Sequence, residues 1–311
     1  MKKVVIALGG NALEDKSLPP TAESQLKVVH KTAQQLAQIS GAGFELAIVH
    51  GNGPQIGRIM LASEGSKDIT PPMPFDVCGA MSQGYIGYHI QQALYDELRK
   101  NGRDIPIVTI ITQVIVDEKD PAFDNPTKPI GPFYSEDEAK ELEKTKGYIM
   151  KEDSGKGWRR VVPSPKPVGI AEIGTVKNLW DSTITVACGG GGIPVVKDEN
   201  GNLKGIAAVI DKDFAAEKLA EEMDADILMI LTEVENVAIN FGSPNQKNLE
   251  KVSVNEIEEY IKENHFAAGS MLPKVEAAVK FAKSKEGRKA IITSLYKGRA
   301  ALEGNAGTHI E

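Results

Sequence analysis

The chain has 311 residues, of which 41% are hydrophobic and 25% are charged, a balance that is typical of a globular protein and excludes wholesale disorder. Its net charge of −7 gives no general attraction for nucleic acid or for an anionic membrane, so we expect neither as a partner. Two cysteines, Cys78 and Cys188, are too few for a disulfide framework or for a structural zinc site. Gly9 interrupts the first apolar run too early for a signal peptide, and no apolar run reaches the length of a membrane helix. We therefore expect a cytoplasmic protein.

Short apolar runs alternate with amphipathic stretches along the chain, which is typical of βαβ units and a mostly parallel sheet. In chain order, the pattern predicts strand 4–8, helix 21–40, strand 44–49, helix 77–99, strand 105–116, strand 184–187, helix 214–222, strand 226–231, helix 271–283 and strand 289–293. We therefore predict an α/β fold.

The alternation lapses between residues 117 and 170. This segment holds seven of the 17 prolines of the chain, namely Pro121, Pro126, Pro129, Pro132, Pro163, Pro165 and Pro167. Proline favours extended and turning backbone over regular elements, while the five aromatic residues of the segment indicate packing that a linker does not need. We interpret 117–170 as an inserted subdomain or lid.

Three glycine-rich turns each follow an apolar run. They are Gly9-Gly10-Asn11, Gly51-Asn52-Gly53-Pro54 and Gly189-Gly190-Gly191-Gly192. Glycine allows backbone N–H groups to approach an anion closely, and in open parallel sheets ligands bind at the carboxyl ends of the strands. A single turn of this kind is explained by strand-to-helix geometry alone, but three in one sheet favour a site that handles phosphate.

Three lysines stand in unusual places. Lys212 and Lys274 lie at predicted helix starts, with Asp213 and Ser270 as the expected N-caps, and a cation there opposes the helix dipole at a cost of about 0.3 kcal/mol or more. A bound anion would explain both, although each alone also reads as a solvated surface lysine. Lys128, between two prolines, suits a positive charge carried by the lid. Together they favour phosphoryl transfer, which needs positioned positive charge around the migrating group.

Other motifs are weak. No GxxxxGK[ST] occurs, and the turn that begins at Gly51 is GxGxxxG, one residue too long for a dinucleotide fingerprint. The residues around Ser82 resemble a nucleophile elbow with His265 available downstream, but the prolines before them do not form the strand that an elbow requires. We expect Ser82 to lie in a glycine-containing helix, and a P-loop enzyme, an oxidoreductase and a hydrolase are all disfavoured.

The opening stretch VVIALGGNAL resembles the amino acid kinase superfamily. Later stretches resemble its carbamate kinase family, namely HGNGPQ, GAMSQG, NPTKPIGPFY, VVPSP, GGGGIP, AVIDKD, ILT and HFAAGSM. The resemblance runs from residue 3 to about residue 309. It implies one domain over 1–311, a three-layer αβα sandwich around a mostly parallel sheet of about eight strands, with a protruding subdomain. The N-terminal half would bind carbamate and the phosphoryl group, and about 205–311 would bind the nucleotide.

The same resemblance implies an Mg²⁺-dependent homodimer that transfers phosphate reversibly between ATP and carbamate, giving ADP and carbamoyl phosphate. The usual direction in the family is ATP synthesis in arginine, agmatine or purine breakdown. By motif match, the catalytic positions are Lys128, Lys212, Asp213 and Lys274. Substrate contacts would come from Gly9, Gly10, Asn11, Gly51, Asn52 and Gly53, and nucleotide contacts from Lys212, Thr232, Val234, Met271 and Lys274. The metal ligands stay unassigned.

Glu233 departs from the family pattern, in which an aspartate is common before the valine. Because glutamate keeps the charge, we expect no effect beyond altered nucleotide contacts. Two alternatives stay open. Another amino acid kinase, acting on acetylglutamate, glutamate or UMP, would share the opening stretch but lack the insert that bears Lys128. A regulatory or structural protein on the same scaffold would not need lysines at all three positions.

Overall fold

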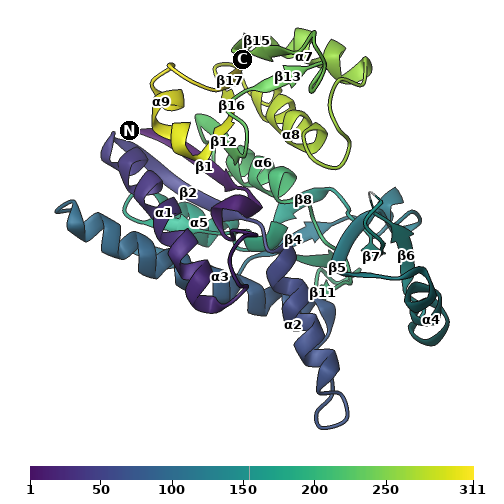
Figure 1. Ribbon diagram of the computed structural model, residues 1–311. Helices are drawn as coiled ribbons and strands as arrows, with labels where there is room; N and C mark the ends of the chain where they lie inside the picture. The colour runs from purple at the N-terminus through teal and green to yellow at the C-terminus, as the bar shows by residue number, and fades with distance from the viewer. Residues whose placement is uncertain (154) are drawn as a thin grey trace.

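The computed structural model describes residues 1–153 and 155–311 and confirms the α/β class (Figure 1). Its main sheet has eight strands in the order β15-β17-β16-β12-β1-β2-β9-β3. Within it, β16 and β17 pair antiparallel and the other neighbours pair parallel. The bounds are β1 (Lys2–Leu8), β2 (Phe44–His50), β3 (Ile107–Thr109), β9 (Ile184–Val186), β12 (Ile227–Thr232), β15 (Lys251–Val252), β16 (Lys289–Ser294) and β17 (Thr308–Ile310).

Helices cover both faces of this sheet, and the central strands are buried on both sides. Along β1, Val5 and Ala7 point into one core, while Val4, Ile6 and Leu8 point into the other. The first core is closed by α5 (Ile173–Trp180), α6 (Lys212–Glu222), α7 (Val254–Lys262) and α8 (Leu272–Lys283), and the second by α1 (Ala22–Gly41), α3 (Phe75–Lys100) and α9 (Gly298–Leu302). This arrangement is the expected three-layer sandwich. None of the helices in the described residues is long and apolar enough to cross a membrane.

Two expected helix caps are wrong. Asp211, not Asp213, caps α6, because the Asp211 side chain accepts a hydrogen bond from the backbone N–H of Asp213. The N-cap of α8 is Met271 rather than Ser270, and it gives no side-chain bond. In the sequence Asp-Lys-Asp, either aspartate satisfies the rule for caps.

The apolar run 105–116, expected as one strand, forms two. Residues 107–109 make β3 at the edge of the main sheet, whereas β4 (Gln113–Val116) belongs to a second sheet of four strands. Between them, the side-chain amide of Gln83 on α3 accepts a hydrogen bond from the N–H of Thr112 and donates one to its carbonyl. Because Thr112 is bonded to a helix side chain in this way, the chain leaves one sheet and enters the other.

The second sheet has the order β11-β10-β4-β8 and lies beside the carboxyl ends of the main strands. Its remaining members are β8 (Pro167–Ile170), β10 (Ile193–Lys197) and β11 (Leu203–Gly205). The C-terminal half also carries a hairpin of β13 (Val237–Ile239) and β14 (Lys247–Leu249). Short 3₁₀ turns occur at η1 (Gly10–Ala12), η2 (Pro121–Phe123), η3 (Gly189–Gly191) and η4 (Leu295–Lys297).

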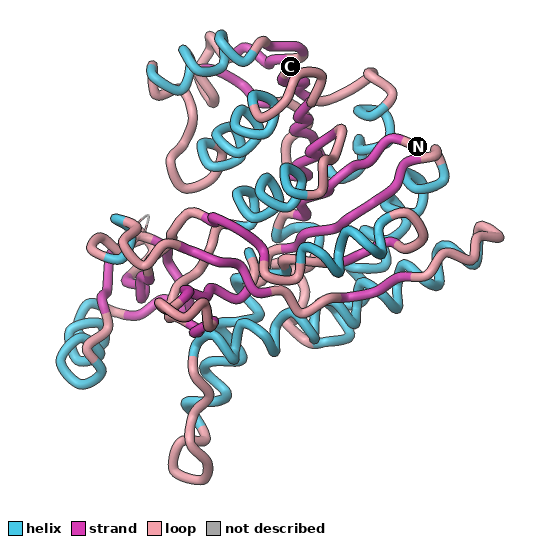
Figure 2. Tube along the Cα trace, turned by 180° about the vertical axis from the view of Figure 1, so that it is seen from behind, coloured by secondary structure: helices cyan, strands magenta, loops and turns pink. Residues whose placement is uncertain are grey.

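Much of the inserted segment folds apart from the main sheet, as Figure 2 shows from behind. It forms a sheet in the order β5-β7-β6, with β5 (Lys128–Tyr134), β6 (Ile149–Glu152) and β7 (Trp158–Val162), and one helix, α4 (Glu136–Lys146). Its last residues, 167–170, form β8 of the second sheet. The subdomain packs on α2 (Gly53–Gly65), where Glu64 accepts hydrogen bonds from Lys146 and Tyr148.

Candidate active site

Two glycine turns meet at one edge of the main sheet. Gly9 follows β1 and Gly51 follows β2, and these strands lie side by side with their carboxyl ends together. A Cβ on Gly9 would come within 2.8 Å of Asn11 Oδ1 and 3.0 Å of the carbonyl oxygen of Leu231, so the turn requires glycine. Asn52 begins α2 as its N-cap. Because backbone N–H groups of both turns stand where parallel strands end, this edge suits an anionic ligand.

The third glycine turn packs against residues that line the site. Gly190, Gly191 and Gly192 all have positive φ, a conformation that side chains rarely adopt. A Cβ on Gly190 would overlap the side chain of Asn52, and one on Gly191 would overlap the carbonyl oxygen of Ile210. Gly190 alone of these three lines the cavity described below. The turn therefore packs its backbone closely against Asn52 and the residue before the N-cap of α6. It contributes little to the cavity wall itself.

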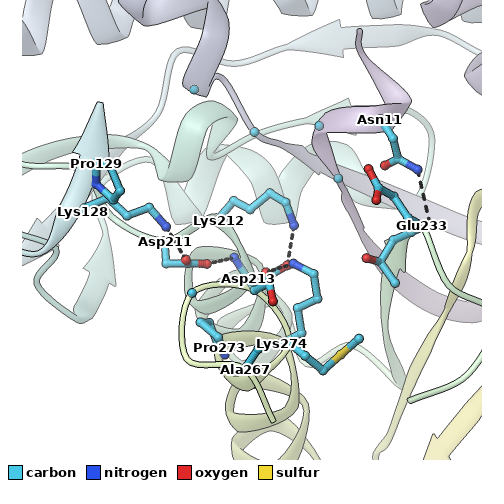
Figure 3. A pocket seen from close by; sticks show the side chains of 18 of the residues that line it. Asn11, Lys128, Pro129, Asp211, Lys212, Asp213, Glu233, Ala267, Pro273 and Lys274 are labelled. Atoms are coloured by element: carbon cyan, nitrogen blue, oxygen red, sulfur yellow. Dashed lines mark hydrogen bonds and ion pairs between the residues drawn. The ribbon is translucent and has the colours of Figure 1, made fainter. Parts of the chain in front are cut away.

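Three lysines and two aspartates form three ion pairs beside these turns (Figure 3). Asp213 accepts hydrogen bonds from Lys212 at 2.5 Å and from Lys274 at 2.8 Å. Asp211 accepts one from Lys128 at 2.6 Å. Lys212 and Asp213 come from the first turn of α6, Lys274 from the first turn of α8, and Lys128 from the start of β5 in the subdomain. The structure thus brings together residues from three distant parts of the chain.

Burial changes the proton affinities of this cluster. Burial lowers the pKa of Lys212, while Asp213 opposes the shift and Lys274 adds to it. Burial alone would raise the pKa of Asp211, but Lys128 and Lys212 outweigh it and hold that pKa well below its usual value. Asp211 is therefore ionised near neutral pH. With three lysines against two carboxylates, the cluster has more basic than acidic side chains beside the two glycine turns.

One cavity of about 620 Å³ is lined by every residue that the family resemblance implied for catalysis, substrate or nucleotide. Besides the turns and the ion pairs, its lining includes Thr232, Val234 and Met271, the expected nucleotide contacts. Apolar side chains also line the cavity, among them Ala238, Phe241 and Phe266. Asn11 donates a 3.4 Å hydrogen bond to the carbonyl of Thr232 and so joins the first glycine turn to the end of β12. The cavity therefore combines charged and apolar side chains in its wall.

Several lining residues escaped the sequence analysis. Asp211 could have been found in part, since an aspartate directly before a helix start is a common N-cap. Phe241 and Ala238 gave no signal, because they follow no motif and reach the cavity through the hairpin β13–β14. Ser82 lies in α3 as expected, fully buried, and its hydroxyl donates to the carbonyl of Gly79 and accepts from Asn52. Such a hydroxyl supports Asn52 and is not presented as a nucleophile.

The fold and the site define a phosphotransferase of the α/β sandwich type, and comparison with known proteins gives the family. The model of the amino acid kinase family matches residues 2–294. Carbamate kinases from Pyrococcus horikoshii and Clostridium perfringens are 55% and 54% identical to the chain, each over 99% of this chain and 99% of the relative. A carbamate kinase from Giardia lamblia bound to AMP-PNP superposes with a TM-score of 0.93 at 45% identity, covering 99% of this chain and 98% of that one.

The chain belongs to the amino acid kinase family and, within it, to the carbamate kinases. It is therefore an enzyme of the phosphotransferase class, as the glycine turns and lysines indicated. Isopentenyl phosphate kinase from T. acidophilum shares the fold at a TM-score of 0.51 and 13% identity, a likeness that concerns the fold alone.

Proposed function

We propose that this chain transfers a phosphoryl group reversibly between ATP and carbamate, giving ADP and carbamoyl phosphate. The observation that carries the proposal is the array of Lys128, Lys212 and Lys274 in a cavity that is also lined by apolar side chains, among them Phe241 and Phe266. A nucleotide needs both kinds of contact, because it has an apolar base and anionic phosphates. Membership among the carbamate kinases supplies the acceptor.

In this proposal the lysines act on the migrating group. Lys212 and Lys274 stabilise charge that spreads over the oxygens of the phosphoryl group in the transition state, and Asp213 holds both ammonium groups in place. Lys128 brings a further charge from the subdomain to carbamoyl phosphate. Gly9, Gly10, Asn11, Gly51, Asn52 and Gly53 bind the carbamate and phosphoryl end through N–H and amide groups. Thr232, Val234 and Met271 contact the nucleotide.

We propose Mg²⁺ as the metal that accompanies the nucleotide. No group of three or more His, Cys, Asp or Glu side chains suited to a metal occurs within residues 1–153 and 155–311. Mg²⁺ commonly keeps several waters and binds substrate phosphates with one or two carboxylates, so this donor set fits a metal that enters with ATP. When bound, it neutralises phosphate charge. Of the carboxylates on the described cavity wall, Glu233 forms no ion pair and is available to it.

The direct test is a coupled assay for ATP formed from ADP and carbamoyl phosphate with Mg²⁺. We expect robust turnover, and none with acetylglutamate, glutamate or UMP as phosphoryl acceptors in the reverse direction. Phosphorylation of one of those acceptors without turnover of carbamoyl phosphate would refute the proposal. Comparing kcat/KM in the two directions tests the proposed physiological direction, ATP synthesis in arginine, agmatine or purine breakdown.

The cytoplasmic location that we propose agrees with Cys78 and Cys188, which are buried and unpaired.

We further propose that the chain is one domain over 1–311, with 117–170 moving as a lid. Glu64 holds the subdomain through Lys146 and Tyr148, and Lys128 holds it at the cavity. The contact of Lys128 at the cavity can be exchanged for contacts with a bound ligand. Hydrogen exchange of 117–170, measured with and without ADP and carbamoyl phosphate, tests this idea. Protection equal to that of the main sheet and unchanged by ligands would contradict it.

The proposed homodimer has a candidate surface on α3. Val77, Met81, Tyr88 and Tyr95 follow helical spacing along this helix and are 37–60% exposed. The adjacent strand β3 is an edge of the main sheet. A second copy of the chain would cover this apolar stripe, which a monomer exposes to water. Light scattering should give twice the chain mass, and Met81→Glu with Tyr88→Glu should give monomers. A wild-type monomer at micromolar concentration would refute the dimer.

A further inference from the structure

Asp211 joins the subdomain to the helix that begins at the phosphoryl site. Its Oδ2 accepts the 2.6 Å hydrogen bond from Nζ of Lys128, 83 residues earlier in the chain. Its Oδ1 accepts a 2.9 Å hydrogen bond from the N–H of Asp213, and through this bond Asp211 caps α6. One carboxylate therefore serves two elements, and each of its oxygens has a separate partner.

The surroundings make the negative charge of Asp211 important for Lys128. Lys212 follows Asp211 directly, and Lys128, Lys212 and Lys274 all line one cavity. Asp213 is already shared between Lys212 and Lys274, so it offers Lys128 no free oxygen. The Asp211 side chain is 15% exposed, which limits screening of its ion pair by water. Without Asp211, Lys128 would face two ammonium groups with no carboxylate of its own.

We infer that Asp211 is a positioning residue, which holds Lys128 of the subdomain over the phosphoryl site and so keeps the lid in place before the substrate binds. This inference rests on the role proposed above for Lys128. An incoming carbamoyl phosphate then meets a lysine that is already near its bound position. Part of the ordering of the lid is complete before binding, which lowers the KM for that substrate.

The alternative is that Asp211 only caps α6. The two roles separate in Asp211→Asn, because asparagine caps helices about as well as aspartate but carries no charge. Glu276→Gln is a matched control. Glu276 faces Lys166 at 3.9 Å, so it also joins the main body to the inserted segment by a carboxylate and a lysine, but it is more exposed and is no part of the cavity wall described above.

The kinetic test compares wild type, Asp211→Asn, Lys128→Ala and the double variant. Asp211→Asn should lower kcat/KM for carbamoyl phosphate by about 10–100-fold, the range typical of residues that orient a functional side chain, mainly through KM. The KM for ADP should change less. In the double variant the loss should equal that of Lys128→Ala, because Asp211 acts through Lys128. Glu276→Gln should match wild type.

Two outcomes overturn the inference: a kcat/KM for Asp211→Asn within twofold of wild type, or losses that multiply in the double variant. A second measurement needs no activity, so it distinguishes failure of this inference from failure of the proposed reaction. Without ligands, the amide hydrogens of β5 should exchange faster in Asp211→Asn than in wild type or in Glu276→Gln. The exchange rates in α6 should be the same in all three proteins. Unchanged exchange in β5 also overturns the inference. If the asparagine variant does not fold, Asp211→Ser keeps a capping oxygen and serves in its place.

Discussion

Lys274 and Asp213, 61 residues apart in the chain, are joined by a 2.8 Å hydrogen bond between the first turn of α8 and the first turn of α6. The same carboxylate accepts a bond from Lys212, and its side chain is 3% exposed. Asp213 therefore fixes the separation of two ammonium groups that would otherwise repel each other at two helix starts. In the proposed reaction, a pair of cations fixed in this way would need little reorganisation as phosphoryl charge develops.

We predict that Lys212→Ala and Lys274→Ala each lower kcat by about 10²–10³, because each removes one preorganised charge from the transition state. Arginine should restore neither, since a planar guanidinium does not reproduce a compact ammonium. Melting temperatures should stay within about 4 °C of wild type, or roughly 1 kcal/mol, because Asp213 keeps one lysine in each variant. Steady-state kinetics at saturating ADP and Mg²⁺ provide the measurement. A kcat near that of wild type in both alanine variants would mean that the lysines are structural.

Gly191 tests the support beneath the site. Its φ is +92°, and a Cβ there would overlap the carbonyl oxygen of Ile210, just before Asp211. We predict that Gly191→Ala costs about 3 kcal/mol or more in unfolding free energy, from strain and overlap together. Gly201→Ala is the matched control, because Gly201 has a φ of +83° with nothing within 4 Å of an added Cβ, so it should cost only about 1 kcal/mol. Equal losses on urea unfolding would show that the overlap is relieved elsewhere.

Much of the fold was predictable, because the signals were local. The helix predicted over 21–40 forms as α1, and Thr21 is its N-cap, whose side chain accepts a bond from the N–H of Ser24. The apolar run of β1 and the long helical pattern of α3 also follow from residues within each element. The meeting of Gly9 with Gly51 was predictable from the rule that parallel strands end at one edge.

The errors occurred where a distant partner decides the structure. The break in 105–116 depends on Gln83, whose amide bonds Thr112 from another element. The second bond of Asp211 depends on Lys128, which lies in a segment without regular periodicity. The place of Phe241 in the cavity wall depends on the hairpin of β13 and β14. No pattern within a single element contains this information.

His50 gives a prediction for acid stability. It is buried at the end of β2, its Nδ1 donates to the carbonyl of Gly51, and its Nε2 has no hydrogen-bond partner in the described residues. Burial lowers its pKa from 6.5 to about 4. In the unfolded chain His50 takes up a proton as the pH falls below about 6.5. In the folded protein it takes up this proton only as the pH approaches about 4. Stability should therefore fall through this window, by at most about 3 kcal/mol from this residue.

The measurement is urea unfolding at several pH values between 4 and 7, for wild type and His50→Asn. Asparagine keeps a side-chain N–H near the carbonyl of Gly51 but does not titrate. Its stability should depend less steeply on pH than that of wild type. Parallel slopes in the two proteins would assign the acid loss to other groups.

The pair of Glu217 and Lys280 gives the last prediction. Glu217 on α6 has a side chain with no exposed area, and one of its oxygens accepts a 2.7 Å bond from Lys280 on α8. The other oxygen, Oε1, has no partner among the described residues. Burial raises the pKa of Glu217, and Lys280 opposes the rise only in part. The folded protein therefore holds this proton to a higher pH than the unfolded chain does.

The sign of the effect follows from that difference. A carboxyl group whose pKa rises on folding stabilises the protein at low pH, and this contribution is lost as the pH increases through the raised pKa. Glu217→Gln removes the titration and supplies an N–H and an oxygen, so it should be as stable as wild type or more stable at pH 8, with a smaller advantage at pH 4. Lys280→Met should be destabilising at pH 8, by about 1–2 kcal/mol, because it leaves a buried carboxylate without its cation. In Glu217→Gln with Lys280→Met that loss should disappear, since no buried charge remains. Urea unfolding of the four proteins at both pH values measures these differences. A double variant that is no more stable than Lys280→Met would show that the loss does not come from an unpaired buried carboxylate.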